Sequence, residues 1–390
     1  MANKAVLEFG TSKIICMIDS ANIKGTDIPG AACVRYDGIK EGQWVNKKTL
    51  LDDVALAIDN AENRIKRQLK SVEVGIPGVF TKVMAIDGRK SVKENLITRE
   101  FIDEMLRECA PRAGKRWQLM EVRPAYFMDD RGELYIGAPV GRHSRFLEGC
   151  FCYMFANTEF LQDVSKLMGT LRLGIDRFVF ENVAQAMYYL PAKARDEMAI
   201  VADIGYQDTS VFVVYGDAVM AHSVIFAGGA TLAEDMQAEL NVDEVMAENL
   251  KRSYIFGISA DRGAIAYAKN AQGKMGAVPS GRVKVVLEKS LSLICQDIKA
   301  IIRNYGNMIR PGTPVYIMGA GARMRGVEVF LSSQLGRRVY VMAADKVYPL
   351  PPVYTSAIAL LDNDNSTVYD LDKNQASGKK EGGFFRAFRR

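Results

Sequence analysis

Ala199–Tyr215, which reads A-I-V-A-D-I-G-Y-Q-D-T-S-V-F-V-V-Y, is the stretch around which the rest of the sequence can be interpreted. Two apolar, β-branched runs flank a polar turn, a pattern that predicts a β-hairpin with a buried base and a polar tip. Gly205 can adopt a positive φ, which would let backbone N–H groups at the tip converge on an anion. Asp203 would then lie where a phosphate-bound Mg²⁺ takes a carboxylate, and Thr209 belongs to the same turn. An ordinary hairpin with a glycine turn is the alternative interpretation.

A second stretch repeats this pattern near the start of the chain. Ala5–Asp19 reads A-V-L-E-F-G-T-S-K-I-I-C-M-I-D, again an apolar run, an acid, one residue, a glycine, a polar turn and an apolar run. Glu8 precedes Asp203 by 195 residues, and Gly10 precedes Gly205 by the same 195. The repeat predicts two related lobes, each opening with a phosphate-loop hairpin, and a nucleotide bound in the cleft between them.

The composition argues against several classes of protein. A chain of 390 residues with 48% hydrophobic residues can bury several cores, so two to four domains are expected. Six scattered cysteines without a C-x-x-C motif predict reduced thiols in a cytoplasmic protein rather than a disulfide framework or a zinc site. His143 and His222 are the only histidines, and neither lies near a candidate nucleophile, which argues against Ser-His-Asp chemistry. We expect no signal peptide and no membrane-spanning segment, which would need about 18 or more apolar residues.

The net charge of +5 arises at the end of the chain. Six basic residues and one acid give +5 within residues 373–390, namely Lys373, Lys379, Lys380, Arg386, Arg389, Arg390 and Glu381. Residues 1–372 are therefore neutral overall, which argues against nucleic acid as a partner.

The spacing of apolar residues predicts helices at 50–69, 99–109, 158–171, 182–190, 231–240, 241–254, 283–304 and 327–335. Residues 83–160 are expected to form an excursion with a small core of its own, containing short strands near 119–128, 132–136 and 148–155. An α+β subdomain of this size is a candidate surface for protein partners, and a plain folded insertion is the alternative.

Other candidate residues lie outside the two hairpins. Gln185, on a predicted helix, could reach the cleft and orient an attacking water, although a lone glutamine is more often a packing residue. Glu248 and Lys251 lie three residues apart on one helical face, where a surface ion pair worth about 0.2–0.5 kcal/mol is the alternative. Gly228-Gly229 precedes a helix, and Gly319-Ala320-Gly321 connects a strand to a helix, where backbone N–H groups can meet a nucleotide.

The chain ends in a polar linker and an amphipathic tail. From Asp362 the composition shifts to Asp, Asn, Ser, Thr, Lys and Gly, which predicts a solvated linker. The tail combines three phenylalanines at positions i, i+1 and i+4 with three arginines, namely Phe384, Phe385, Phe388, Arg386, Arg389 and Arg390. This pattern predicts an interfacial, membrane-binding helix. The alternative, a random basic tail, does not explain three phenylalanines in five residues.

The two hairpins, the connecting helix and Met318–Gly326 resemble, in order, the phosphate, connect and adenosine motifs of the actin-like ATPase superfamily. Within it, nearly the whole chain resembles FtsA, the family of bacterial cell-division actin homologues. The most specific motifs are G-T-S-K (Gly10–Lys13), I-T-R-E-F-I (Ile97–Ile102), A-P-V-G (Ala138–Gly141), R-F-L-E (Arg145–Glu148) and A-E-N-L-K-R-S-Y (Ala247–Tyr254).

The resemblance implies an α/β, two-lobed actin-like ATPase fold with an inserted α+β subdomain in the first lobe and a C-terminal amphipathic helix. The first lobe would comprise residues 1–82 and 161–195, with the inserted subdomain at 83–160. The second lobe would comprise residues 196–229 and 301–362, with a helical subdomain at 230–300. A flexible linker at 363–383 and a membrane-targeting tail at 384–390 would follow.

The resemblance also implies the site residues. ATP would be bound by Gly10, Thr11, Ser12, Lys13, Asp203, Gly205, Thr209, Gly228, Gly229, Glu248, Lys251, Gly319, Ala320, Gly321 and Met324. Mg²⁺ would be held by Asp203 and Glu8, and the candidate catalytic residues are Glu8, Gln185 and Asp203. Gln185 falls where actins carry their water-orienting glutamine, although FtsA proteins usually do not.

Four residues depart from the family pattern. Glu8 stands where the family usually has Asp, Tyr206 and Gln207 replace glycines of the second turn, and Ala320 replaces another glycine. The carboxylate of Glu8 would reach one methylene further into the water shell of the metal. The side chains of Tyr206, Gln207 and Ala320 hinder close approach of the backbone to phosphate. We therefore expect nucleotide binding with slow or negligible hydrolysis.

The resemblance implies a self-polymerising protein that tethers filaments of the tubulin-like protein FtsZ to the cytoplasmic face of the cell membrane at the division site. Residues 83–160 would recruit other division proteins. A PilM-like pilus-assembly actin homologue is one alternative, although PilM proteins as a family lack the amphipathic terminus. A small-molecule kinase of the same fold is another, but it would need a general base that is not evident beyond the phosphate-loop acids.

Overall fold

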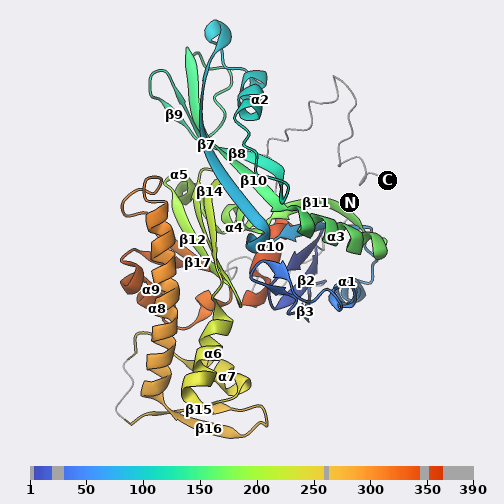
Figure 1. Cartoon of the computed structure of the whole chain (residues 1–390), viewed down its shortest axis with the longest axis vertical. Helices are drawn as coiled ribbons and strands as arrows, with labels where there is room; N and C mark the ends of the chain where they lie inside the picture. The colour runs from blue at the N-terminus through green and yellow to red at the C-terminus, as the bar shows by residue number, and fades with distance from the viewer. Residues whose placement is uncertain (1–3, 20–29, 259–262, 343–350, 363–390) are drawn as a thin grey trace.

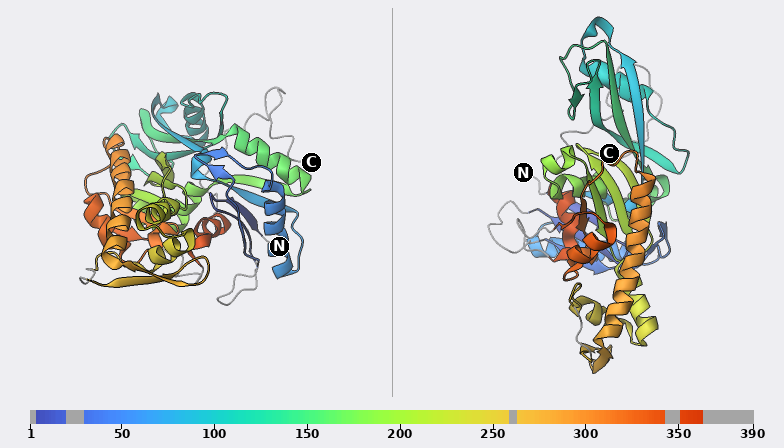
Figure 2. Two further views of the ribbon diagram at one scale, coloured as in Figure 1. Left: turned by 60° about the horizontal axis from the view of Figure 1, so that its bottom comes forward. Right: turned by 90° about the vertical axis from the view of Figure 1, so that its left-hand side faces the viewer.

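The computed structural model describes residues 4–19, 30–258, 263–342 and 351–362. The predicted linker and membrane-targeting tail, residues 363–390, lie outside these ranges. Two five-stranded sheets form the middle of the molecule, with a third sheet at one end of its long axis and a helical region with a small hairpin at the other (Figures 1 and 2).

The first lobe is built on a sheet with the strand order β11-β6-β1-β2-β3. All five residues of β1 are buried, which is typical of a strand in a sheet that is covered on both faces. β1 runs antiparallel to β2 and parallel to β6. The strands are β1 (Ala5–Phe9), β2 (Lys13–Ile18), β3 (Ala32–Arg35), β6 (Ser71–Ile76) and β11 (Gly174–Phe180).

The second lobe repeats this plan with the order β14-β13-β12-β17-β18. Its central strand β12 runs antiparallel to β13 and parallel to β17, as β1 does to β2 and β6. The strands are β12 (Ala199–Ile204), β13 (Thr209–Tyr215), β14 (Ala218–Ile225), β17 (Val315–Met318) and β18 (Val339–Val341).

The two central hairpins pair in the same register. Phe9 lies opposite Ile14, and Ile204 lies opposite Thr209, so both members of the pair are displaced by the 195 residues seen in the sequence. The repeat therefore holds at the level of individual strand pairs and brings equivalent turns to equivalent places in the two lobes.

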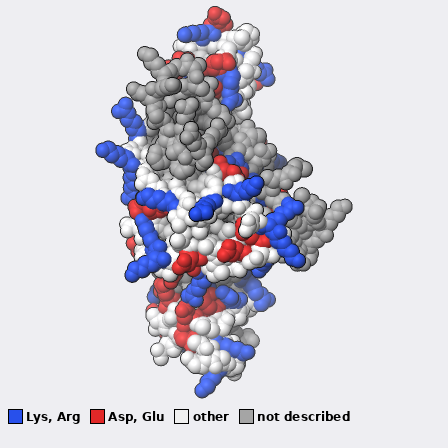
Figure 3. Space-filling view, turned by 90° about the vertical axis from the view of Figure 1, so that its right-hand side faces the viewer, with Lys and Arg blue, Asp and Glu red and all other residues white. Residues whose placement is uncertain are grey.

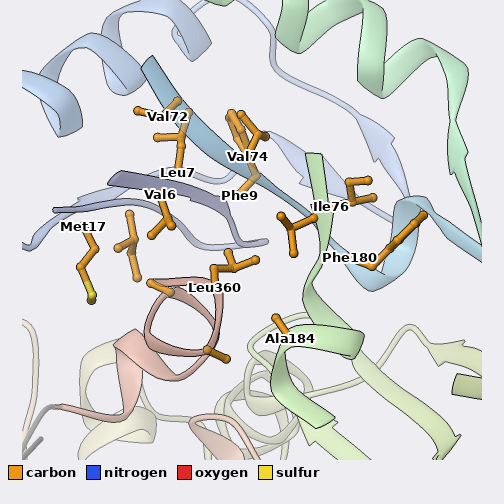
Figure 4. Close-up of a cluster of buried hydrophobic side chains, with 14 of the residues drawn as sticks. Val6, Leu7, Phe9, Met17, Val72, Val74, Ile76, Phe180, Ala184 and Leu360 are labelled. Atoms are coloured by element: carbon orange, nitrogen blue, oxygen red, sulfur yellow. The ribbon is translucent and has the colours of Figure 1, made fainter. Parts of the chain in front are cut away.

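Two helices join the lobes by packing across them. α4 (Glu181–Tyr189) follows the first sheet but also contacts β13 and β14, whereas α10 (Thr355–Asp362) follows the second sheet and contacts β1, β2 and β6. Leu360 of α10 and Ala184 of α4 lie beside the core of the first sheet (Figure 4). Burying one such leucine is worth about 1.5–3 kcal/mol, so this packing fixes how the two hairpins face each other.

A third sheet, in the order β7-β10-β8-β9, extends from the first lobe. Its elements are β7 (Thr81–Ser91), α2 (Arg99–Glu108), β8 (Trp117–Asp129), β9 (Leu134–Tyr135) and β10 (Phe146–Asn157). Thr98 caps α2 by accepting a hydrogen bond from the Phe101 N–H at 3.2 Å. The sheet has its own apolar core, which includes Ile102, Phe127 and Phe151.

The region 230–300 holds three helices and a β-hairpin. Its elements are α6 (Gly229–Leu240), α7 (Glu244–Ser253), β15 (Ile265–Lys269), β16 (Met275–Pro279) and α8 (Ser280–Asn304). α6 ends at Leu240 because Asn241 takes a left-handed conformation with φ 53°. α7 begins at Glu244 because Asp243 caps the N–H of Met246 at 2.8 Å.

The remaining elements are β4 (Ile39–Lys40), β5 (Gln43–Trp44), α1 (Leu50–Ile65), α3 (Thr158–Thr170), α5 (Ala192–Asp196) and α9 (Val327–Leu335).

Most predicted helices are confirmed with small shifts at their ends. The prediction for 50–69 is wrong at its end, since Lys66 takes a left-handed φ of 55° and stops α1. The single helix predicted at 241–254 begins three residues later, and β7, β15 and β16 were not predicted. The domain boundaries stay a prediction.

No helix in the described ranges is long and apolar enough to cross a bilayer. Basic and acidic side chains are both present on the face shown in Figure 3.

Candidate functional site

The turns of the two central hairpins have the same internal hydrogen bond. The N–H of Gly10 donates to the carbonyl of Lys13 at 2.8 Å, and the N–H of Gly205 donates to the carbonyl of Asp208 at 2.9 Å. Each of these four residues has its counterpart 195 positions away. The repeat in the sequence thus corresponds to the same hydrogen-bonded turn in both hairpins.

The two turns also meet each other. The Thr11 hydroxyl donates to Oδ1 of Asp208 at 3.3 Å and accepts a hydrogen bond from the Gln207 N–H at 3.3 Å. Segments about 200 residues apart in the sequence therefore face one another, as the cleft hypothesis requires. The carbonyl of Ser12 accepts a hydrogen bond from the N–H of Tyr36 at 3.1 Å, which holds the first turn against the end of β3.

The predicted positive φ of Gly205 is wrong, because neither Gly10 nor Gly205 lies in the left-handed region. Glycine is needed at 205 for space: a Cβ there would lie 2.9 Å from the Asp208 carbonyl oxygen. The second turn is therefore compact rather than left-handed.

The start of α6 is bonded to the second turn. The N–H groups of Gly229 and Ala230 donate to the carbonyls of Gly205 and Tyr206 at 3.0 and 2.6 Å. A Cβ on Gly228 would lie 2.7 Å from the Gly205 carbonyl oxygen, so only glycine fits this approach. The Thr209 hydroxyl donates to the carbonyl of Ala227 at 2.8 Å. These groups hold the turn in place with hydrogen bonds of the fold itself.

Lys251 joins this group from α7. Its buried ammonium donates to the Gly229 carbonyl at 2.7 Å and to the carboxylate of Glu248. Burial lowers the pKa of Lys251, and the pairing with Glu248 opposes that shift. The pair is therefore an interior feature beside the second turn and not the surface ion pair of the alternative interpretation.

The two candidate metal ligands and the candidate water-orienting residue lie close together near the two turns. They are Glu8, Asp203 and Gln185. Nε2 of Gln185, buried on α4, donates to Oδ2 of Asp203 at 2.6 Å and to the Ser356 hydroxyl at 3.0 Å. Lys13 donates to the Val353 carbonyl, and its ammonium lies 3.8 Å from Oε1 of buried Glu8. Burial raises the pKa of Glu8 and also that of Asp203, and Lys13 opposes both shifts.

Glu181 is a member of this group that the sequence analysis missed. It is the first residue of α4 and is buried, and burial together with Glu8 and Asp203 raises its pKa well above the ordinary value. The signal was present, since an acid commonly occupies the first turn of a helix, but the helix was predicted to begin at the following residue, Asn182.

The group fits a divalent cation. Within the described residues, Oε2 of Glu8 and Oε1 of Glu181 are buried without a hydrogen-bond partner. Mg²⁺ is usually held by one or two carboxylates, with waters and substrate phosphates completing its shell. In the same part of the chain, no three His, Cys, Asp or Glu side chains form a metal cluster by themselves.

The predicted adenosine turn lies directly over Asp203. Gly319 has a φ of 83°, and a Cβ there would lie 2.2 Å from Oδ1 of Asp203. A Cβ on Gly321 would lie 2.3 Å from the Ile204 side chain. Ala320 precedes the short 3-10 helix Gly321–Arg323, and the partly buried Met324 packs against the second-lobe core. Hydrogen bonds and close approaches thus connect the second turn to Thr11, Gly228, Gly229, Lys251 and Gly319, whereas the assignment of the nucleotide-binding residues stays a prediction.

Asp208, which the sequence analysis did not single out, gives the site a pH dependence. Burial and the charge of Asp203 raise its pKa to about 6, against about 3.9 for an ordinary aspartate. A carboxyl with a raised folded-state pKa stabilises the fold below its unfolded pKa, and this stability is lost as pH rises through about 6. We expect Asp208→Asn to raise the free energy of unfolding at about pH 7.5 by on the order of 1–2 kcal/mol and to change it little at about pH 4. Urea unfolding at both pH values measures this, and an equal gain at both would contradict it.

Comparison with solved structures identifies the fold. No family model matches the chain. Its structure superposes on PilM in the PilM-PilN type IV pilus biogenesis complex with a TM-score of 0.60 and 17% identity, covering 92% of this chain and 97% of the other. MreB 5 of Spiroplasma citri bound to AMPPNP gives a TM-score of 0.53 and 13% identity, covering 92% and 95%. The fold is that of the actin-like ATPases, and the predicted two-lobed architecture is confirmed.

Several curated sequences that the chain resembles are cell-division proteins. Cell division protein FtsA of Neisseria meningitidis serogroup B is 23% identical over 360 residues, covering 89% of this chain and 82% of the relative. FtsA of Enterococcus faecalis is 22% identical over 386 residues, covering 96% and 86%. The predicted resemblance to FtsA, a cell-division actin homologue, is confirmed.

Proposed function

We propose that the chain binds Mg·ATP between its lobes, polymerises, and tethers FtsZ filaments to the cytoplasmic face of the cell membrane at the division site. The main observation in support of nucleotide binding is the pair of turns, which share one strand register and one internal hydrogen bond and meet at Thr11 and Asp208. Similarity to FtsA over most of the chain supports the role in cell division.

In this proposal the phosphates lie between Gly10–Lys13 and the turn at 203–209. Lys13 supplies positive charge to them, and Asp203 and Glu8 hold Mg²⁺, with Glu181 close by. Bound Mg²⁺ neutralises phosphate charge. The base would lie between the Glu248–Lys251 pair and Gly319–Gly321.

Hydrolysis is expected to be slow. Nε2 of Gln185 is engaged by Asp203 and Ser356, so a role of Gln185 in orienting water stays a prediction. Tyr206 and Gln207 place side chains in the second turn, which limits approach of the backbone to phosphate. The chain is at most a slow ATPase in this proposal.

Replacing Asp203 with alanine tests the nucleotide site. We expect Asp203→Ala to weaken Mg·ATP binding by about tenfold or more and to reduce the difference between binding with Mg²⁺ and with a chelator, because a metal-facing carboxylate is removed. Titration calorimetry measures both quantities, and far-UV circular dichroism confirms folding. Asp297→Ala, which removes an exposed acid on α8, is the matched control. Absence of ATP binding by the unaltered chain at millimolar nucleotide would contradict the proposal.

The inserted sheet is proposed to recruit other division proteins. None of the predicted site residues lies within 83–160, which leaves the outer surface of this sheet for partners. Its inner face, however, supplies Ala125, Cys150 and Cys152 to the second-lobe core. Substitutions on exposed positions, such as Leu134 or Val140, therefore test partner binding better than deletion of the subdomain.

The PilM-like alternative has one observation in its favour, the structural similarity over 92% of this chain. Sedimentation with FtsZ filaments separates the two functions, because only the cell-division proposal expects the chain to pellet with them.

The domain boundaries predicted from the sequence are part of the proposal. The small-molecule kinase activity considered from the sequence is not part of this proposal.

A further inference from the structure

We propose that Asp208 is a specificity-determining residue of the phosphate site, which lowers affinity for a nucleotide according to the number of its phosphates. The inference rests on the proposed binding of nucleotide between the two turns. It goes further by assigning to one side chain the discrimination between nucleoside, diphosphate and triphosphate.

The internal repeat shows what is unusual about Asp208. It stands 195 positions after Lys13, so the two residues occupy equivalent places in the two turns, and their carbonyls accept equivalent hydrogen bonds. The first turn thus carries a cation where the second carries an acid. A phosphate between the turns is attracted to one and repelled by the other.

The carboxylate of Asp208 reaches across to the opposite turn. Its Oδ1 accepts a hydrogen bond from the Thr11 hydroxyl at 3.3 Å, which places the carboxylate between the two tips. The Gln207 N–H contacts the same hydroxyl at 3.3 Å. Phosphate groups bound between the turns would therefore lie close to this carboxylate.

The backbone of the second turn is held in place at Asp208. The Asp208 carbonyl accepts the N–H of Gly205 at 2.9 Å and lies 3.1 Å from where a Cβ of Gly228 would be. Gly228 begins the segment whose next two N–H groups bind the same turn. The backbone of Asp208 is consequently fixed, and only its side chain can rotate.

Among the described residues Asp208 forms no ion pair, and Lys13 is directed to Glu8 and the Val353 carbonyl. The nearby carboxyl of Asp203 acts in the same direction, since its charge raises the pKa of Asp208. Repulsion between like charges is stronger in a partly buried site than in bulk water, because screening is weaker there.

Binding of adenosine, ADP and ATP to four forms of the full chain tests the inference, with Mg²⁺ present throughout. Asp208→Asn removes the charge and keeps the size, Asp208→Glu keeps the charge, and Asp297→Asn removes an exposed charge on α8. We expect Asp208→Asn to bind ATP about tenfold more tightly than the unaltered chain, ADP more tightly by a smaller factor, and adenosine equally. Asp208→Glu and Asp297→Asn are expected to match the unaltered chain.

The outcomes separate this inference from the proposed function. Equal or weaker ATP binding by Asp208→Asn, in a chain that itself binds ATP, would overturn the role of Asp208 and leave nucleotide binding intact. An equal gain for adenosine and ATP would also overturn it, since a structural effect on the turn does not depend on phosphate charge. If no form binds any of the three ligands, nucleotide binding and this inference fall together.

Discussion

Removal of residues 384–390 is expected to abolish binding of the assembled protein to anionic lipid vesicles. Fully burying one phenylalanine is worth roughly 1.5–3 kcal/mol, and insertion at an interface captures part of this for Phe384, Phe385 and Phe388. Each basic residue near an anionic surface adds about 1 kcal/mol. Because a short peptide must also be ordered as a helix, one tail alone binds weakly.

Firm attachment is therefore expected to depend on several tails presented by one polymer, since a second binding event on a tethered polymer is effectively intramolecular. Monomeric variants are expected to bind vesicles poorly even with an intact tail. Co-sedimentation with vesicles measures this. Phe385→Glu is expected to release the protein, and Phe385→Leu, the matched control, is expected to retain most binding. Added salt is expected to weaken binding only in part, and equal sedimentation of the full and truncated chains would contradict the prediction.

The repeat was the part of the fold that the sequence predicted best. A spacing of 195 between Glu8 and Asp203 is preserved because the two hairpins share one register, so a local pattern reports directly on local structure. The strand β7 was missed because its partner, β10, lies more than 50 residues further along the chain. Its own sequence, T-K-V-M-A-I-D-G-R-K-S, lacks a strict alternation of apolar and polar residues.

The site was predictable where a motif is local and unpredictable where it depends on distant contacts. Gln185 was predicted near the cleft, and its Nε2 lies 2.6 Å from Oδ2 of Asp203. The burial of Glu181 and the contact of Asp208 with Thr11 depend on segments that are distant in the sequence. The glycine at 205 was recognised for the wrong reason, because the space left by the Asp208 carbonyl, rather than a positive φ, requires it.

The remaining large effect concerns Gly319, where Ala is expected to destabilise the fold and to remove nucleotide binding. Two costs add at this position. The backbone is left-handed with φ 83°, which costs a residue with a Cβ about 1–2 kcal/mol. The new Cβ would also lie 2.2 Å from Oδ1 of Asp203 and 2.6 Å from the Ile204 carbonyl oxygen, and such overpacking costs about 1–3 kcal/mol.

Gly312 offers a matched control in the same lobe. Its φ is 77°, but a Cβ there would have no neighbour within 4 Å, so Gly312→Ala has the cost of the left-handed conformation without the collision. Urea unfolding is expected to show a loss of about 1–2 kcal/mol for Gly312→Ala and of about 3 kcal/mol or more for Gly319→Ala. Calorimetry is expected to show lost Mg·ATP binding only for Gly319→Ala, because the collision displaces Asp203 from the amide of Gln185. Equal losses of stability in the two variants would mean that the turn at 319–321 moves away from Asp203 without cost.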